Sequence, residues 1–365
     1  MKIEPADRPA KYPSLTINLP HLRNNIRVIR ELCESRGIHI TAVTKVFEGD
    51  PRIAQVLVEE GLTTLGDSRV DNLEFMKDVQ AKDKWLIRPP MLSEIPRLVK
   101  YGTASLNSEL AVIEAINEEC GKQGKRHKII LMADLGDIRE GFVDYDEMIE
   151  VAKKVVAMPN VDLYGIGVNL TCFSFVQYDT EKLTELVQLK KRVEEATGVK
   201  LQVVSGGNSA TLDLMLRGGI PEGVNNLRLG EIGLVGRANY GCDPDFTHRD
   251  VFTLRAEVVE CRDKPSFPVG QLTVDAFGHV GHYEDRGIRR RALIAVGKVD
   301  YGDPADLKPR MAGVEILGAS SDHTILDVEA VKDRIKVGDI LEFDVNYGSL
   351  VNLTNTPGVE LVTKE

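Results

Sequence analysis

The chain of 365 residues is 42% hydrophobic and 28% charged, which is typical of a soluble globular protein and excludes a disordered, collagen-like or membrane-spanning chain. With 56 acidic and 46 basic side chains, the formal net charge is -10, so there is no broad cationic surface for a nucleic acid. Five scattered cysteines without a CxxC pair indicate reduced thiols, and residues 1–14 contain no apolar signal-like run, so we expect a cytoplasmic protein that does not engage a membrane.

Strand and helix patterns alternate through the first two thirds of the chain. An opening strand at 15–19 precedes a helix at 21–34, for which Pro20 provides the start. Eight short apolar runs then follow, separated by polar breaks and amphipathic segments, and such alternation predicts a parallel sheet closed into a (β/α)₈ barrel over residues 1–240. The expected strands are 38–46, 63–66, 84–88, 103–106, 127–134, 162–169, 200–205 and 224–228, and the clearest further helices are 51–60, 108–119, 145–158 and 181–196.

The pattern changes after residue 240. Strand-like runs joined by short polar turns occupy 251–261, 271–277, 292–300, 314–318, 324–329 and 340–347. They predict a C-terminal all-β domain over residues 241–365, with which the N-terminal strand could pair.

Polar residues that end the barrel strands are the first candidates for a site, because barrel enzymes work at the C-terminal face. Lys45 ends an apolar run, where it is either a carbonyl-attacking amine or a lysine whose head reaches solvent. Glycine-rich turns at 205–211 and 228–233 follow the seventh and eighth strands, the usual phosphate site of this barrel, although a glycine turn is often only a turn.

Other polar residues allow a site role or a surface role. Arg139 follows the fifth strand and Asn169 ends the sixth, and either could be an ordinary loop residue. Asp275, His279 and His282 could suggest a metal, but no second cluster supports one, and we expect none. A lysine beside a phosphate site points to pyridoxal 5'-phosphate held as a Schiff base, or to an enzyme of phosphorylated sugars that uses the same lysine chemistry.

These residues resemble the alanine racemase family of barrel-type pyridoxal phosphate enzymes, and within it the ornithine racemase-like branch. The resemblance covers nearly the whole chain, and its strength lies in the order and spacing of several short motifs. The family's A-V-V-K, aspartate-glycine-arginine, N-S-A, R-P-G and S-M-D-Q-T segments are similar to 42–45, 134–139, 208–210, 228–230 and 320–324.

The resemblance implies a role for each matching residue. Lys45 would form the internal aldimine, and Arg228 would face the pyridine nitrogen. The phosphate would be held by Ser209, by the backbone of Gly230 and Glu231, and by Tyr347 from the second domain. Asn208 would also bind the cofactor, and Arg139 would lie near its phenolic oxygen. A guanidinium cannot accept a proton from the ring, so the cofactor stays a weak electron sink, which suits racemisation with one acid/base group on each face of Cα.

The second acid/base group is less clear from the sequence. The family's G-Y-A-D-G segment reads Gly297 to Tyr301 here, so the strict register puts Lys298 at the tyrosine position and Tyr301 three residues later. We rank Tyr301 first, His323 second because imidazole titrates at a pKa of about 6.5, and Lys298 third.

Departures from the family pattern predict a pocket that differs from one for alanine. Gly49, Met132 and Asn169 replace a tyrosine, a lysine and a histidine, and Asn169, Ser321 and Asp322 are expected to contact substrate. A carboxylate such as Asp322 or Glu48 could pair with the side-chain amine of ornithine or lysine, although Asp322 could equally brace a turn.

The resemblance implies a small amino-acid substrate and a homodimer with shared sites. Two alternatives stay open: a D-amino-acid lyase of the aldolase or dehydratase type, and a non-catalytic carrier of pyridoxal phosphate, against which the second domain counts.

Overall fold

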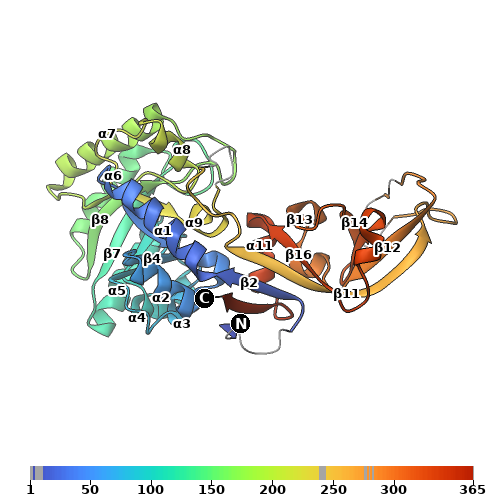
Figure 1. Ribbon diagram of the computed structural model, residues 1–365. Helices are drawn as coiled ribbons and strands as arrows, with labels where there is room; N and C mark the ends of the chain where they lie inside the picture. The colour runs from blue at the N-terminus through green and yellow to red at the C-terminus, as the bar shows by residue number, and fades with distance from the viewer. Residues whose placement is uncertain are drawn as a thin grey trace. The chain divides into compact units, whose positions relative to one another are not determined.

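Eight parallel strands close into a barrel in the computed structural model, within the part of the chain from Arg23 to His248 (Figure 1). Each strand precedes a helix in the chain and pairs with the next strand, and the last strand pairs with the first to close the ring. The strands are β3 (His39–Val43), β4 (Thr64–Asp67), β5 (Asp83–Leu86), β6 (Ala104–Asn107), β7 (His127–Ala133), β8 (Val161–Val168), β9 (Val203–Ser205) and β10 (Asn226–Leu229). The predicted barrel is confirmed.

The structure describes residues 3–4, 11–237, 244–274, 278, 280–281 and 283–364. The chain forms two units: the barrel unit is Arg23–His248, and the β unit combines Met1–Leu22 with Arg249–Glu365. The sequence pattern places a single boundary near residue 240, whereas in the structure the segment before the barrel belongs to the β unit. No helix among the described residues is long and apolar enough to span a membrane.

Three helices of the barrel unit begin at an aspartate that caps them. Asp50 accepts a hydrogen bond from the backbone N–H of Arg52, and Pro51 takes the first helical position of α2. Asp144 and Asp179 cap α6 and α7 in the same way. The helices are α1 (Leu19–Glu34), α2 (Pro51–Glu59), α3 (Val70–Phe75), α4 (Ile95–Tyr101), α5 (Leu110–Gln123), α6 (Tyr145–Val156), α7 (Thr180–Thr197), α8 (Thr211–Leu216) and α9 (Glu231–Val235), with 3₁₀ turns η1 (Lys45–Phe47) and η2 (Leu92–Glu94).

The interior of the barrel is filled by apolar side chains. Trp85, Leu106, Ile130 and Met132 pack together and are at most 2% exposed. A filled interior leaves the ends of the strands as the place for polar chemistry.

A mostly antiparallel sheet forms the β unit, and Figure 1 shows β11 (Phe252–Pro265) as its long strand. The sheet order is β1-β17-β2-β11-β12-β15-β14, and β16 pairs with β11 and β13. The other strands are β1 (Ile3–Glu4), β2 (Ser14–Asn18), β12 (Ile288–Ile294), β13 (Leu307–Pro309), β14 (Glu315–Ala319), β15 (Thr324–Asp327), β16 (Ile340–Val345) and β17 (Glu360–Lys364). The predicted β-domain is therefore confirmed, and β2 pairs in parallel with β17 and antiparallel with β11.

Two predicted strands of the β unit run too far. The run 292–300 ends as a strand at Ile294, and Lys298–Tyr301 forms the short helix α10, where Asp300 accepts a hydrogen bond from the Gly297 N–H at 2.9 Å. The run 340–347 ends at Val345, and helix α11 (Tyr347–Asn355) follows because Asn346 caps it by accepting from the Ser349 N–H at 3.0 Å. Of the predicted strand 271–277, the described residues 271–274 form only an isolated bridge at Val274, and 275–277 lie outside the described residues.

Candidate active site

Predicted site residues of the barrel unit lie at the C-terminal ends of its strands. Lys45 comes two residues after β3, Arg139 lies in the loop after β7, and Asn169 follows β8 directly. Ser209 lies in the loop after β9, and Arg228 is the penultimate residue of β10. Because the strands of a closed parallel barrel all end at one mouth, the fold brings these five residues to the same end of the unit.

Lys45 lies just outside the sheet. Strand β3 ends at Val43, and Lys45 begins the single 3₁₀ turn η1, with an exposed side chain. Val46 and Phe47 are buried and anchor the turn to the barrel. The predicted strand 38–46 therefore ends earlier than expected, and the lysine lies at the open end of the barrel instead of in its apolar interior.

Arg228 is a buried cation, 5% exposed. Its Nη1 donates to Ser205 Oγ at 2.6 Å, and its Nη2 donates to the Val168 carbonyl at 2.8 Å and to Asn169 Oδ1 at 3.3 Å. Among the described residues, no carboxylate forms an ion pair with it, and its Nε–H makes no hydrogen bond. Burial lowers the pKa of this guanidinium, which nonetheless remains protonated at neutral pH. The Nε–H can still donate a hydrogen bond, and an aromatic ring nitrogen is a suitable acceptor.

Two asparagines connect Arg228 to the loop after β8. The Nδ2 of Asn208 donates to Asn169 Oδ1 at 3.2 Å and contacts Cys172 Sγ at 3.5 Å, while Asn169 Oδ1 also accepts from Arg228. The exposed thiol of Cys172 in turn lies near Arg139, whose guanidinium is paired with Glu140. These five residues form one connected polar set at the barrel mouth. Asn169 thus contacts the predicted cofactor residues, and its contact with substrate stays a prediction.

The loop between β9 and α8 is folded tightly over a buried tyrosine. Gly207 has a φ of +127°, and a Cβ there would come within 2.5 Å of the Tyr178 ring and 2.4 Å of Thr211 Oγ1, so only glycine fits. The Tyr178 hydroxyl accepts a hydrogen bond from the Leu170 N–H at 2.7 Å, and burial raises its pKa. Tyr178 therefore fixes this loop against the loop after β8.

Donor groups for an anion gather where β9 and β10 end. Ser209 is 6% exposed, and its Oγ lies 3.5 Å from the backbone nitrogen of Gly230. Asn208 accepts from the Ala210 N–H at 2.9 Å, which shapes the turn, and Glu231 follows Gly230 as the first residue of α9. A hydroxyl and backbone N–H groups in this arrangement suit a phosphate.

A groove with a volume of about 950 Å³ lies on the β unit. Lys298 and Ser321 line it, together with Arg291 and Tyr283. Lys298 and Ser321, both predicted to act from this unit, therefore lie at a concave surface. Tyr301, Asp322, His323 and Tyr347 are not among the residues that line the groove.

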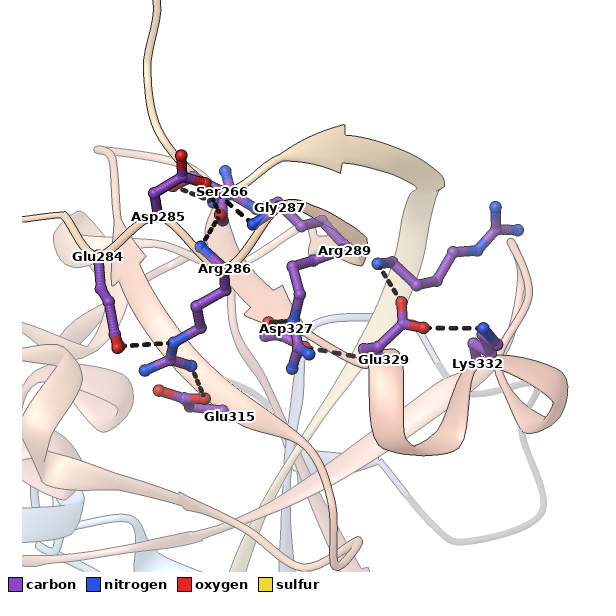
Figure 2. A network of polar contacts seen from close by, with 12 residues as sticks. Ser266, Glu284, Asp285, Arg286, Gly287, Arg289, Glu315, Asp327, Glu329 and Lys332 are labelled. Carbon is purple, nitrogen blue, oxygen red and sulfur yellow. Dashed lines mark hydrogen bonds and ion pairs between the residues drawn. The ribbon is translucent and has the colours of Figure 1, made fainter.

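Ion pairs hold one wall of the groove, as Figure 2 shows. Arg286 lies between Glu284 and Glu315, donating to them at 2.8 and 2.9 Å, and all three line the groove. Arg289 pairs with the buried Asp327 through two nitrogens, at 2.8 and 3.1 Å. These five side chains carry three negative and two positive charges, so most of the charge on this wall is paired.

Tyr301 is held away from solvent. Its side chain is 0% exposed, and its hydroxyl lies 2.6 Å from Thr324 Oγ1. Since the Thr324 hydroxyl donates its own proton to the Val296 carbonyl at 2.7 Å, Tyr301 must donate to Thr324. Burial raises the pKa of Tyr301 to about 12. This environment suits a packing residue and disfavours a proton-transfer group, contrary to its first place in the ranking from sequence.

The remaining predicted residues of the β unit lie in exposed or half-buried positions. Asp322 and His323 are exposed in the turn between β14 and β15, which the Ser320 N–H closes by donating to the His323 carbonyl at 2.8 Å. Tyr347 is half-buried at the start of α11. Asp275, His279 and His282, weighed above as a metal cluster, lie outside the described residues.

Sequence reasoning missed three residues that shape the barrel mouth. Asp67 ends β4 and is 0% exposed, so the rule that picks polar residues at strand ends would have found it. Cys172 follows Asn169 by three residues and could have been found by extending that rule into the loop. Tyr178 carries no such signal, because its contact with Gly207 joins two separate loops.

Comparison with known proteins agrees with this geometry. The family profile described as "Alanine racemase, N-terminal domain" matches residues 17–237. An ornithine racemase from Acetoanaerobium sticklandii is 41% identical over 93% of this chain and 96% of its own length, and a lysine racemase from Thermotoga maritima is 38% identical over 96% and 98%. Among solved structures, an alanine racemase from Streptomyces lavendulae superimposes with a TM-score of 0.77 over 98% of both chains at 18% identity, which supports the fold. On this evidence the chain belongs to the alanine racemase family.

Proposed function

We propose that this protein is a pyridoxal phosphate-dependent racemase of a basic amino acid, with ornithine as the first candidate substrate and lysine as the second. The observation that carries the reaction class is the buried Arg228, whose guanidinium has no carboxylate partner among the described residues and lies at the same barrel mouth as the exposed Lys45. The two relatives named for ornithine and lysine, matched over nearly all of both chains, support the substrate class.

The donors at the barrel mouth fit the cofactor of the family. Arg228 has an Nε–H free for the ring nitrogen, and Ser209 with the Gly230 and Glu231 backbone offers donors for the phosphate. Asn208 shapes that turn, Arg139 would lie near the phenolic oxygen, and Tyr347 would contribute from a β unit. When bound, pyridoxal phosphate joins the substrate amine and delocalises the electron pair left on Cα when its proton departs.

The chain's own residues move the protons and limit side reactions. The Lys45 amine exchanges a proton with one face of Cα, and a second group exchanges one with the opposite face. Arg228 would donate a hydrogen bond without giving up its own proton, which would leave the ring nitrogen of the bound cofactor unprotonated and disfavour competing reactions. Asn169 supports this role by accepting from Arg228 Nη2 at 3.3 Å.

For the second group we place Lys298 ahead of His323, and both ahead of Tyr301. Lys298 lines the groove of the β unit, whereas the Tyr301 hydroxyl is buried and donates to Thr324. Ser321 lines the same groove, and Asp322 lies next to it in the chain as an exposed carboxylate. A carboxylate there suits the side-chain amine of ornithine or lysine.

We further propose a homodimer in which each β unit completes the site of the other subunit, and a cytoplasmic location. The division of the predicted site residues between the barrel unit and the β unit supports the first proposal. The free thiols of Cys33, Cys120, Cys172 and Cys261 support the second.

The test is chiral chromatography of L-ornithine, L-lysine and L-alanine after incubation with the protein and pyridoxal phosphate in D₂O. Appearance of D-ornithine with deuterium on Cα would establish the reaction and its substrate together. If no amino acid exchanges while the cofactor binds, the lyase and carrier alternatives replace the racemase.

Lys45→Ala should abolish both turnover and the visible absorbance of the bound cofactor, because no other amine is expected to hold it. Lys122→Ala, on the exposed side of α5, serves as the matched control and should retain both. An unchanged spectrum in Lys45→Ala would contradict the proposal. Absorbance spectroscopy and chiral chromatography on both variants provide the measurement.

A further inference from the structure

Asp67 is a buried carboxylate beside the turn that carries Lys45. It ends β4 and is 0% exposed. Its Oδ2 accepts a hydrogen bond from Thr44 Oγ1 at 2.6 Å, and its Oδ1 accepts from the Arg69 N–H at 2.9 Å and from Asn72 Nδ2 at 3.0 Å. The Asn72 amide and the Arg69 N–H can only donate, which favours the ionised carboxylate, whereas burial raises the pKa of Asp67 above its ordinary value. None of the ion pairs among the described residues includes Asp67.

Thr44 connects this carboxylate to the lysine turn. Its N–H donates to the Gly66 carbonyl at 2.9 Å, which keeps it in register with β4. Its own carbonyl accepts from the N–H groups of Phe47 and Gly49, both at 3.2 Å, so the turn closes on Thr44. A residue that is bonded through its N–H, its carbonyl and its hydroxyl fixes the point at which the chain leaves the sheet, one residue before Lys45.

The C-terminal end of the turn, at Gly49, packs against Asn72, which is part of the hydrogen-bond network around Asp67. Gly49 has a φ of +64°, and a Cβ added there would lie 3.0 Å from Asn72 Cβ and 3.1 Å from the Asn72 carbonyl oxygen. Asn72 also donates to Asp67. The turn is thus held at its start by the bond from Thr44 to Asp67, and at its end by close packing against Asn72.

We propose that Asp67, acting through Thr44, is a positioning residue that sets the location of Lys45 at the barrel mouth. The proposal rests on the role of Lys45 in the proposed function. Lys45 is the first residue of this turn, so the bond from Thr44 to Asp67 sets where its backbone leaves the sheet, and proton transfer needs such order. Asp67 also bonds the Arg69 N–H beside α3, a local role that a test must separate from the positioning role.

Thr44→Val separates the two roles, because it removes the hydroxyl but leaves the bonds from Arg69 and Asn72 to Asp67 in place. Thr44→Ser restores the hydroxyl. Thr103→Val is the matched control. Thr103 Oγ1 donates to the buried Asp83 at 2.9 Å, and this pair lies at the N-terminal ends of β5 and β6, whereas Lys45 follows the C-terminal end of β3. Both pairs join a threonine hydroxyl to a buried aspartate, but Asp83 is also paired with Lys128 at 2.6 Å. Only the pair of Thr44 and Asp67 adjoins Lys45.

The first readout needs no cofactor. In the apoprotein, hydrogen exchange of the Phe47 and Gly49 amides should accelerate on the order of tenfold in Thr44→Val and stay near wild type in Thr44→Ser and Thr103→Val. The second readout is borohydride trapping of pyridoxal phosphate on Lys45, which should be slower in Thr44→Val. The third is kinetic: kcat should fall on the order of 10-fold to 100-fold with little change in KM.

The outcomes are separable. If exchange and trapping in Thr44→Val match those of Thr103→Val, the positioning role is wrong, whatever reaction the enzyme performs. If the wild-type protein traps no pyridoxal phosphate on Lys45, the proposed function is wrong, and the exchange data still decide whether Asp67 orders the turn. If Thr44→Val does not fold, Thr44→Ala removes the same hydroxyl without adding a buried methyl contact, and it must show the same acceleration.

Discussion

Arg228 makes a set of hydrogen bonds that a lysine in its place could not reproduce. Its two terminal nitrogens supply Ser205 Oγ, the Val168 carbonyl and Asn169 Oδ1 from different strands, which requires a planar fork. Arg228→Lys should therefore bind pyridoxal phosphate less tightly and lose most racemase activity while keeping its fold. Cofactor content after dialysis, circular dichroism and chiral assay test this expectation, and wild-type turnover in the variant would contradict it.

Tyr301→Phe should leave racemisation intact and lower the free energy of unfolding by about 1 kcal/mol, the usual value of one hydrogen bond. The Thr324 hydroxyl keeps its bond to the Val296 carbonyl in the variant, so no buried donor is left without a partner. Lys298→Met, at the edge of the groove, should suppress racemisation instead. Urea unfolding and chiral assays on both variants test these expectations, and loss of activity in a folded Tyr301→Phe would return that residue to first place.

Cys172 should be the thiol that reports on the cofactor. Burial raises the pKa of Cys33 to about 12 and that of Cys120 to about 11, so both are inert at neutral pH, whereas Cys172 is exposed beside Asn208. We expect iodoacetamide to modify Cys172 quickly in the apoprotein and slowly with pyridoxal phosphate present. Half-buried Cys261, in the β unit, is the internal comparison and should be indifferent to the cofactor. Equal Cys172 labelling with and without cofactor, measured by peptide mass spectrometry, would place the thiol outside the site.

The sequence predicts the location of a site residue well where that location depends on its place in one strand. Lys45, Asn169 and Arg228 each stand at the end of an apolar run, and the structure places all three at the barrel mouth. It predicts poorly where contacts join distant segments. The burial of Tyr301 depends on Thr324, 23 residues away in the chain, and the hydrogen bond from Thr44 to Asp67 spans 23 residues. Local pattern carries no information on such pairs.

At the level of elements, the alternation of strand and helix patterns is enough to predict the barrel. The same kind of pattern misses two helices of the β unit. Each predicted barrel strand overlaps an observed one, because a strand buried on both faces is a continuous apolar run. The segments that form helices α10 and α11 were predicted as strand, because each continues an apolar run that begins as a strand. Only the capping bonds at Gly297 and Asn346 mark the change, and these depend on local geometry that composition does not reveal.

The pairing of β12 with β15 should make the β unit sensitive to acid. Burial raises the pKa of Asp327, but hydrogen bonds from Arg289 and the Glu329 N–H outweigh it, so the pKa lies below its ordinary value. Such a carboxyl stabilises the fold above its unfolded pKa of about 3.9, and the contribution is lost as the pH falls further.

We therefore expect the free energy of unfolding to decline below about pH 4, and Asp327→Asn to lose less stability over that range than wild type. Urea unfolding followed by circular dichroism at a series of pH values measures the two slopes. Asp333→Asn, at an exposed position, is the control and should behave as wild type. Parallel curves for Asp327→Asn and wild type would show that another group governs the acid response.

At the scale of the whole molecule, the proposed shared site predicts complementation between two inactive variants. Lys45→Ala lacks the barrel residue, and Lys298→Met lacks the β-unit residue, so a mixed dimer would contain one site with both intact. After subunit exchange at equal concentrations, about a quarter of all sites should be active, since about half of the dimers are mixed and each has one intact site. Chiral assay of the mixture measures this. No recovery in a mixture shown by mass spectrometry to exchange subunits would indicate that each chain completes its own site.

Because β2 lies between β11 and β17 in the sheet, it has no partner strand while the barrel part of the nascent chain is being made. Leu15 and Ile17 are 0% exposed in the finished sheet, yet both neighbouring strands lie beyond the barrel in the sequence, the second at Glu360–Lys364. Ribosomes add about 5–20 residues per second, so β2 emerges on the order of ten seconds or more before its first partner exists. The barrel strands β3 to β10 are made during that interval, and throughout it β2 is an apolar strand without its partners, a natural target for chaperones during translation.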